Sequence, residues 1–373
     1  MPLYSFVLAS SILTHNTFTR DQANTSGRKM LQTISYSKTI SEHVSHLYDG
    51  VKNTKIPQSE AQQFQAALNL ASRYRTRDTT KSLIAIFTNY AVIGLSIFIS
   101  ELAFSKGYTS SLVYAVACLV IASRLRAFEN LVHEASHYNL FPSPSTHYKL
   151  EPLYSFPVFR LLKDYRHSHS IHHNHLGDPT KDPDLIRILD LGLDKLPERP
   201  FHFLLSLPLS GFVHYEYLTT TFLDFWTSPA APLAKTLFWA LILTTSWAAG
   251  HLPALGWYYA VPFFGVLPVT RYWAEASEHL GMDLGGRFGN SRSNLGLAHL
   301  WYMHPHNDGY HAVHHLYSQV PFHELPAAHA ALMEGNEAFR TGNVVSYGFL
   351  ETFRQMAARK MAWKNVVGGS KRD

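Results

Sequence analysis

The sequence predicts an all-α protein: a membrane-embedded bundle of four transmembrane helices with a cytosolic helical cap that carries a histidine-based metal site. Of the 373 residues, 46% are hydrophobic and only 16% are charged, and this balance favours a membrane domain. Four apolar segments approach the roughly 20 residues that a helix needs to cross a bilayer. Eight histidines fall into three short clusters, which indicate where the chemistry lies.

Charge and cysteine content narrow the class of function. The formal net charge is +5, from 32 basic and 27 acidic residues. Because no dense run of lysine or arginine is present, nothing points to nucleic acid as a partner. An anionic cytosolic membrane surface accounts for the small positive surplus. Cys118 is the single cysteine, which excludes an intrachain disulfide framework and a cysteine-based metal site.

The chain is expected to have three parts. Residues 1–80 form a polar N-terminal tail, rich in Ser and Thr, with one surface helix near residues 58–75. Residues 81–330 form the membrane domain. Residues 331–373 form cytosolic C-terminal helices and a short basic tail.

Four segments are expected to span the membrane. They cover residues 83–104, 108–127, 232–250 and 252–272. Only Ser105-Lys106-Gly107 separates the first two, so these two form a tight hairpin. Two further apolar segments, 150–162 and 201–218, contain Pro, Lys, Glu or His, and we expect them to lie along the membrane surface.

Basic residues orient this bundle. Lys81 and the arginines of residues 73–77 precede the first span, Arg124 and Arg126 end the second, and Arg271 ends the fourth. The positive-inside rule places these ends in the cytosol. All three histidine clusters then lie on the cytosolic side, where residues far apart in sequence can meet in one site.

The histidine clusters have the spacing of metal ligands carried by helices. The first is an HxxxH box, and the other two are HxxHH boxes. Their members are His133 and His137; His169, His172 and His173; and His311, His314 and His315. Spacings of three and four residues place side chains on one face of a helix, and neutral imidazole binds iron, copper, zinc and nickel. Eight nitrogens are too many for one tetrahedral zinc and suit two metal ions.

These boxes resemble those of the membrane fatty-acid desaturase and hydroxylase superfamily. Their type, order and spacing agree from about Leu83 to about His329, and so do the flanking residues 174–184, 307–310 and 320–323. The resemblance implies two non-haem iron ions, with all eight box histidines as ligands and O2 as co-substrate. It also implies that His279 is a ligand, because many relatives place an extra histidine just past the fourth span.

The carboxylates beside His279 have an open role. Glu275 lies one helical turn before His279 on the same face, where relatives can have an asparagine that contacts the metal through water. Glu278 directly precedes His279. Each is either a ligand or part of an exposed helix end.

Several other polar residues near the boxes do not match the superfamily pattern. We interpret these histidines as surface, packing or supporting groups: His167, His175, His304, His306, His323 and His329. Asp178, Asp182 and Asp184 lie among prolines, where a turn-forming role accounts for them. An aspartate here could also accept a hydrogen bond from a ligand histidine.

The resemblance implies an oxidoreductase that introduces a C=C bond into an acyl chain or a related lipophilic or amphipathic metabolite. A hydroxylase or ketolase would use the same di-iron site, and the sequence does not separate these reactions. The sequence has no His-Pro-Gly-Gly motif of a fused haem module, so electrons are expected from a separate b-type cytochrome or ferredoxin with its reductase. A small amphipathic acid or amino-acid derivative of secondary metabolism is one substrate option. The membrane is the endoplasmic reticulum if the protein is eukaryotic and the inner membrane if it is bacterial.

Two other classes of protein compete with this interpretation. The first box, His133-Glu134-Ala135-Ser136-His137, also satisfies the HExxH pattern of zinc proteases. Such an enzyme has no use for two further HxxHH boxes. A catalytically inactive membrane scaffold is the second alternative, and it would lack bound metal.

Overall fold

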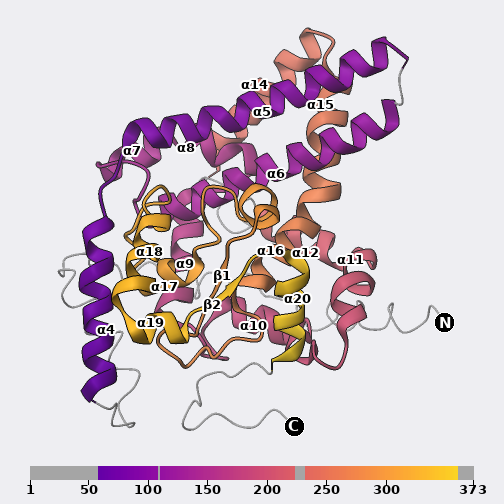
Figure 1. The fold of residues 1–373 in the computed structure, drawn as a ribbon. Helices are drawn as coiled ribbons and strands as arrows, with labels where there is room; N and C mark the ends of the chain where they lie inside the picture. Colours follow the sequence, from indigo (N-terminus) through magenta and orange to yellow (C-terminus); the bar gives the residue numbers. More distant parts are fainter. Residues whose placement is uncertain (1–57, 108–109, 223–231, 360–373) are drawn as a thin grey trace, which may run out of the picture. The chain divides into compact units, whose positions relative to one another are not determined.

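A computed structural model of the chain describes residues 58–107, 110–222 and 232–359. The expected N-terminal tail at 1–57 and basic C-terminal tail lie outside the described residues. The described residues belong to one compact unit, in which helices dominate (Figure 1). The all-α expectation misses one element, a two-stranded parallel sheet of β1 (Arg292–Asn294) and β2 (Val344–Ser346).

Two long antiparallel helices provide the first membrane hairpin, α5 (Thr79–Ser105) and α6 (Ser110–Ser136). Both are long and apolar enough to cross a membrane. Large apolar side chains such as Ile84 and Phe98 of α5 are exposed, as expected for a surface that faces lipid. From residue 121 onward α6 is buried throughout, because its second half leaves the apolar layer and enters the histidine-rich part of the protein (Figure 1).

A helical run over residues 252–279 follows the same plan and is also long and apolar enough to span. It consists of α15 (Leu252–Leu255), π-helical turns at Gly256–Ala260 and Pro262–Val266, and α16 (Leu267–His279). Its first part exposes Trp257 to the surroundings. The run is longer than the expected span at 252–272, so that its last turn carries the residues up to His279 inward.

The third expected span is short. α14 covers Leu233–Ala248, 16 residues, which corresponds to about 24 Å of helix against a hydrocarbon core of about 30 Å. Of the part of the chain that the structure describes, three helices meet both the length and the hydropathy of a span. The four-span arrangement therefore stays a prediction, although α14 does expose Leu237, Leu241 and Trp247.

The arginines expected to mark the ends of spans lie inside the protein. Arg124 and Arg126 are buried in α6, where they donate to backbone carbonyls of residues 301–303. Arg271 pairs with Glu275 at 2.5 Å. These arginines make internal contacts, whereas Arg73, Arg75 and Lys81, which lie before and at the start of α5, are exposed. The orientation of the bundle in the membrane stays a prediction.

Shorter helices surround the inner ends of α6 and α16 (Figure 1). These are α4 (Gln58–Ala71), α7 (Pro144–Lys149), α8 (Glu151–Tyr154), α9 (Leu162–His175), α10 (Pro183–Asp190), α11 (Leu207–Leu209), α12 (Phe212–Thr221), α17 (His311–Leu316), α18 (Leu325–Gly335), α19 (Glu337–Gly342) and α20 (Phe349–Ala358). The first, α4, fills most of the segment where a surface helix was expected and packs against α18 and α19. The segments expected along the membrane surface are helical but broken into short pieces.

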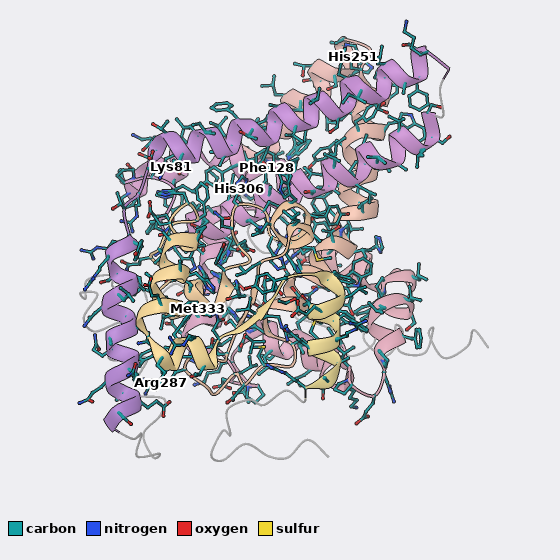
Figure 2. All side chains as sticks on the ribbon, viewed as in Figure 1. Lys81, Phe128, His251, Arg287, His306 and Met333 are labelled. Carbon is teal, nitrogen blue, oxygen red and sulfur yellow. The ribbon has the colours of Figure 1, made fainter. Side chains whose placement is uncertain are left out.

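Contacts from α5 tie the membrane hairpin to the histidine-rich part. The rings of Tyr90 and Phe128 lie 4.9 Å apart between α5 and α6. Asn89 of α5 lies 3.0 Å from Nε2 of His306, in the segment before α17 (Figure 2). The segment before α17 is therefore held against α5, which packs on the helix that carries His133.

Candidate metal centre

Nine histidines converge in two adjacent groups, and they are the nine that the sequence singled out. The first group contains His133, His137, His169, His173 and His314, and the second contains His172, His279, His311 and His315. In the first group the candidate ligand atoms all lie within 4.8 Å of one another. In the second, His311 joins the others through Nε2–Nε2 distances of 3.2 Å to His279 and 3.1 Å to His315.

Each HxxHH box serves both groups. The three histidines of a box share one face of the helix, but the intervening one is turned about 100° around the axis from the last one, so it can reach a neighbouring position. In α9, His169 and His173 join the first group and His172 joins the second. In α17 the assignment is reversed: His311 and His315 join the second group and His314 joins the first. A helix whose histidine face spans two adjacent metal positions explains this spacing.

The HxxxH box adds a second such pair to the first group. His133 lies in the last turn of α6, and His137 follows directly after the helix. The backbone continues to turn there, because the amide of His137 donates to the carbonyl of Glu134 at 3.2 Å. Both imidazoles therefore reach the first group, as expected if the helix continues past the span.

Three of these imidazoles are oriented by acceptors on their outer nitrogen. The pairs are His133 Nδ1 with Asp308 at 2.7 Å, His172 Nδ1 with Asp182 at 2.8 Å, and His279 Nδ1 with the Asn290 carbonyl at 2.9 Å. A carboxylate or carbonyl only accepts, so Nδ1 carries the hydrogen and Nε2 turns a lone pair toward its group. This is the arrangement that metal-binding histidines require.

The inner nitrogens fit a metal ion better than they fit one another. Nε2 of His314 lies 2.8 Å from Nε2 of His133 and 3.0 Å from Nε2 of His173. Nε2 of His137 is buried without a hydrogen-bond partner. Lone pairs at this distance repel unless a cation lies between them, and metal–nitrogen bonds of roughly 2.1 Å place neighbouring ligands about 3 Å apart. The donor set of neutral imidazoles suits iron, zinc or copper.

Burial keeps most of the nine imidazoles in the form that binds metal, whereas at His172 the nearby Asp184 and Asp182 outweigh burial and raise the pKa. Burial, followed by the neighbouring histidines, holds the pKa of His137, His169 and His173 well below its usual value. The same causes lower the pKa of His311, His314 and His315. At neutral pH these groups are therefore uncharged and ready to coordinate.

Asp308 is the main supporting residue that the sequence analysis missed. Burial alone would raise the pKa of Asp308, but His133 and Arg126 outweigh it and hold that pKa below its usual value. The backbone beside it is unusually close to β1: a Cβ on Gly309 would lie 2.1 Å from the carbonyl oxygen of Asn294. Asp308 belongs to the Asn-Asp-Gly-Tyr stretch noted before the third box, which was the available signal.

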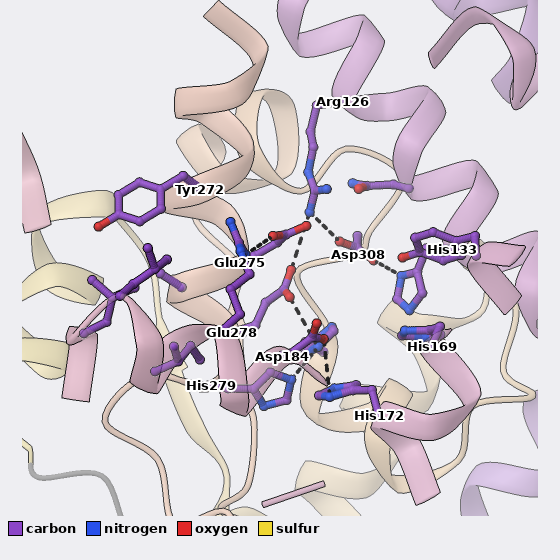
Figure 3. A pocket seen from close by; sticks show the side chains of 18 residues that line it. Arg126, His133, His169, His172, Asp184, Tyr272, Glu275, Glu278, His279 and Asp308 are labelled. Atoms are coloured by element: carbon purple, nitrogen blue, oxygen red, sulfur yellow. Dashed lines mark hydrogen bonds and ion pairs between the residues drawn. The ribbon is translucent and has the colours of Figure 1, made fainter. Parts of the chain in front are cut away.

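A small cavity connects the two groups (Figure 3). Its volume is about 60 Å³, and its wall includes His133 and His169 of the first group with His172, His279 and His311 of the second. Apolar side chains from α10 and its surroundings close another side, among them Ile188, Leu191, Leu193 and Tyr272. A bound molecule here would contact both candidate metal positions.

Charged residues line the same cavity. Arg126 reaches between carboxylates of Glu278 at 3.6 Å and Asp308 at 3.8 Å (Figure 3). Asp184 lies 3.3 Å from Nδ1 of His172, and its side chain is 55% exposed. Arg187 is also part of the wall. The cavity therefore offers an ionic side as well as an apolar one.

The carboxylate of Glu275 contacts arginines and is not among the candidate metal ligands, although its four-residue spacing from His279 puts both residues on one face of α16. Its carboxylate contacts Arg187 at 2.8 Å and Arg271 at 2.5 Å, so two guanidinium groups already hold both oxygens. Glu278 lies closer to the second group, with Oε2 at 3.6 Å from Nε2 of His311. The structure thus separates two carboxylates that the sequence left equivalent.

The zinc-protease pattern in the first box has no matching geometry. Glu134, which would be the general base, accepts a hydrogen bond from the backbone amide of Phe322 at 2.8 Å. His133 and His137 instead join three other histidines in the first group.

His167, which the box pattern excludes as a ligand, is exposed on α9 and lies outside both histidine groups.

Together, the fold and the site define a protein with helices long and apolar enough to cross a membrane and a histidine-rich candidate metal centre at their inner ends. The fatty acid desaturase family matches residues 109–343 of the chain, and the chain belongs to this family. It is also similar to the dihydrorhizobitoxine desaturase of Bradyrhizobium elkanii, with 28% identity over 301 residues that cover 74% of this chain and 82% of the relative. The superfamily resemblance is confirmed, and the protein is a desaturase-like oxidoreductase.

Proposed function

We propose that the protein is an O2-dependent membrane di-iron desaturase that introduces a C=C bond into an acyl chain or a related lipophilic or amphipathic metabolite. The convergence of nine histidines into two adjacent groups around one cavity carries this proposal. Membership of the desaturase family supports the reaction class.

Iron bound at the two groups would pass electrons from the external donor to dioxygen, and dioxygen activated in this way would supply the oxidising power that breaks an alkyl C–H bond. The protein itself has three tasks. The nine histidines hold the metals, Asp308 and Asp182 keep two imidazoles correctly oriented, and burial of the groups excludes water from the reacting atoms. No nucleophile or general acid is needed.

The cavity supports an amphipathic substrate. Ile188, Leu191 and Tyr272 can pack against an alkyl segment, whereas Asp184 and Arg187 give the same cavity a polar side. The name of the relative from Bradyrhizobium elkanii specifies dihydrorhizobitoxine as the compound that this relative desaturates. We therefore place that compound beside fatty acyl chains as a candidate substrate, which is consistent with a role in secondary or lipid metabolism.

We further propose four spans, with α14 as the third and the histidine groups on the cytosolic side. The end of α5, the beginning of α6 and the turn that joins α14 to α15 all lie on the side away from the sheet and α17 (Figure 1). Exposed apolar residues of α11 and α12, such as Leu209 and Phe212, support contact of these helices with the membrane surface. The membrane is the endoplasmic reticulum or a bacterial inner membrane.

Electrons are proposed to come from a separate b-type cytochrome or a ferredoxin with its reductase. The reaction requires a donor, and the sequence has no His-Pro-Gly-Gly motif of a fused haem module. The mild positive charge of the chain would favour an acidic carrier at the cytosolic surface.

The proposal is tested with protein purified in detergent and supplied with iron, O2, an electron donor and candidate substrates. Mass spectrometry of the products distinguishes the reactions. Loss of two hydrogens, absent in a His314→Ala control, supports desaturation. Gain of one oxygen would identify a hydroxylase or ketolase instead, and iron-free folded protein would contradict both.

A further inference from the structure

We propose that Glu278 is a carboxylate ligand of the metal at the second histidine group. This inference rests on the proposed function to the extent that metals bind at the nine histidines. It does not depend on the substrate or on the reaction. It would make the two metal positions chemically unequal, with histidines alone at the first and a mixed set at the second.

The composition of the two groups leaves a place for such a residue. The first group receives two pairs of histidines spaced by four residues, from α6 and α9, together with His314. The second receives one such pair, from α17, together with His172 and His279. The second group is therefore one protein ligand short of the first, on the side where α16 approaches.

Glu278 lies within reach of that position. Its Oε2 is 3.6 Å from Nε2 of His311, and one carboxylate oxygen lies within 4.8 Å of the candidate ligand nitrogens of both His279 and His311. Two ligands at roughly 2.1 Å from one ion lie about 3 to 4 Å apart when the angle between them is 90° or somewhat wider. The carboxylate projects from α16 toward the second group (Figure 3).

The other contacts of Glu278 are long for a buried carboxylate. Its side chain is 10% exposed, and its contacts with Arg126 at 3.6 Å and His304 at 3.4 Å are longer than good charge-assisted hydrogen bonds. Glu275, three residues earlier on the same helix, has contacts of 2.5 and 2.8 Å with two arginines. A buried charge needs a close partner, and a cation at the second group would supply one for Glu278.

Arg126 connects this carboxylate to the first group. The same guanidinium nitrogen that lies 3.6 Å from Glu278 lies 3.8 Å from Asp308, and Asp308 orients His133. One guanidinium therefore lies between two carboxylates, one near each histidine group. In the first group the carboxylate acts through a histidine, and in the second it would bind directly.

The decisive variant is Glu278→Gln, which preserves the size of the side chain and an oxygen that can face Arg126. Glu275→Gln is the matched control, because it removes another carboxylate from the same helix. Each protein is loaded with ⁵⁷Fe. Iron per chain and the Mössbauer spectrum of the reduced protein are then measured, and elution as a single symmetric species in detergent serves as the check on folding.

We expect wild type and Glu275→Gln to hold about two irons per chain in two distinguishable environments. Glu278→Gln should either change the spectrum of one environment alone or lose that iron, so that the content falls toward one per chain. Two irons with wild-type spectra in Glu278→Gln would overturn the inference and leave Glu278 as an ion-pair partner of Arg126.

A second variant keeps the test valid if Glu278→Gln does not fold. Glu278→Asp retains a carboxylate that is one methylene shorter. A spectral change confined to one iron supports direct binding, and the unchanged wild-type spectrum contradicts it. Folded wild-type protein that binds no iron would instead contradict the proposed di-iron function. Failure of the Glu278 inference and failure of the proposed function are therefore distinguishable.

Discussion

Two histidine-rich stretches follow each other in the sequence, and only one of them joins the candidate metal centre. In residues 299–306 each imidazole has a partner elsewhere in the protein: Nε2 of His299 lies 2.8 Å from the Thr352 hydroxyl, and Nε2 of His306 lies 3.0 Å from the Asn89 amide. In α17, only a few residues later, Nε2 of His311 and Nε2 of His314 approach other histidine nitrogens.

This difference shows what distinguishes a packing histidine from a candidate ligand. Both kinds are buried, so burial alone does not separate them. A packing histidine is satisfied by amides, hydroxyls or carbonyls. Three candidate ligands use the outer nitrogen for an acceptor, as His133 does with Asp308. The inner nitrogens of His311 and His314 lie within 3.2 Å of other imidazole nitrogens.

Removing one histidine from each kind of stretch should have the largest effect. His314→Ala and His172→Ala should each lower turnover by at least roughly 100-fold, because a metal position with too few ligands binds weakly. His306→Ala should keep about two irons and lose stability by about 1–3 kcal/mol, since Asn89 loses its partner. Iron analysis and turnover measured on the three purified variants check this. Loss of iron in His306→Ala alone would reverse our assignment.

Removing the acceptors behind the ligands should have a smaller effect. Asp308→Asn and Asp182→Asn should each weaken metal binding by about 10- to 100-fold, because the imidazoles lose the partner that orients them. Competition with a chelator measures this affinity. Asp178→Asn is the control, since Asp178 caps the exposed turn at Thr180 and should leave binding unchanged. Equal effects in all three variants would show that general loss of charge is responsible.

Acid should act on the packing histidines through stability. Burial lowers the pKa of His299 from about 6.5 to about 4, so this group stays neutral in the fold while the unfolded chain takes up a proton as the pH falls below 6.5. Stability is therefore present above pH 6.5 and is lost between about 6.5 and 4. We expect metal-free His299→Gln to lose less stability than metal-free wild type on going from pH 7.5 to 5.5, by about 1 kcal/mol. Chemical denaturation at both pH values measures the difference, and equal losses would contradict it.

The smallest effect is expected at a histidine that is neither a buried packing residue nor a candidate ligand. His167 is exposed on α9, only two residues from His169. His167→Ala should retain most activity and about two irons per chain. Complete loss of both would overturn its exclusion from the site.

The sequence was sufficient for features that repeat at helical spacing. The three boxes and the long apolar stretches of α5 and α6 are local patterns, because three- and four-residue periods and helix length follow from backbone geometry. His279 stands alone in the sequence, and only the superfamily resemblance pointed to it.

Contacts between segments far apart in the chain could not be predicted from the sequence, because they leave no local pattern. Nothing local indicates that Arg126 lies beside Asp308, or that Arg271 and Arg187 draw Glu275 away from the second group. Arg126 and Arg271 were interpreted as markers of membrane ends because a sequence shows the charge of a residue but not its partner. Partner choice depends on tertiary packing, and for the same reason the role of Glu278 was left open.

The central claim is that the nine histidines hold two metal ions. The most direct test is elemental analysis of protein purified in detergent, with iron and zinc reported per chain alongside proof of folding. The account predicts about two irons per chain. One zinc per chain, or folded protein without metal, would contradict it.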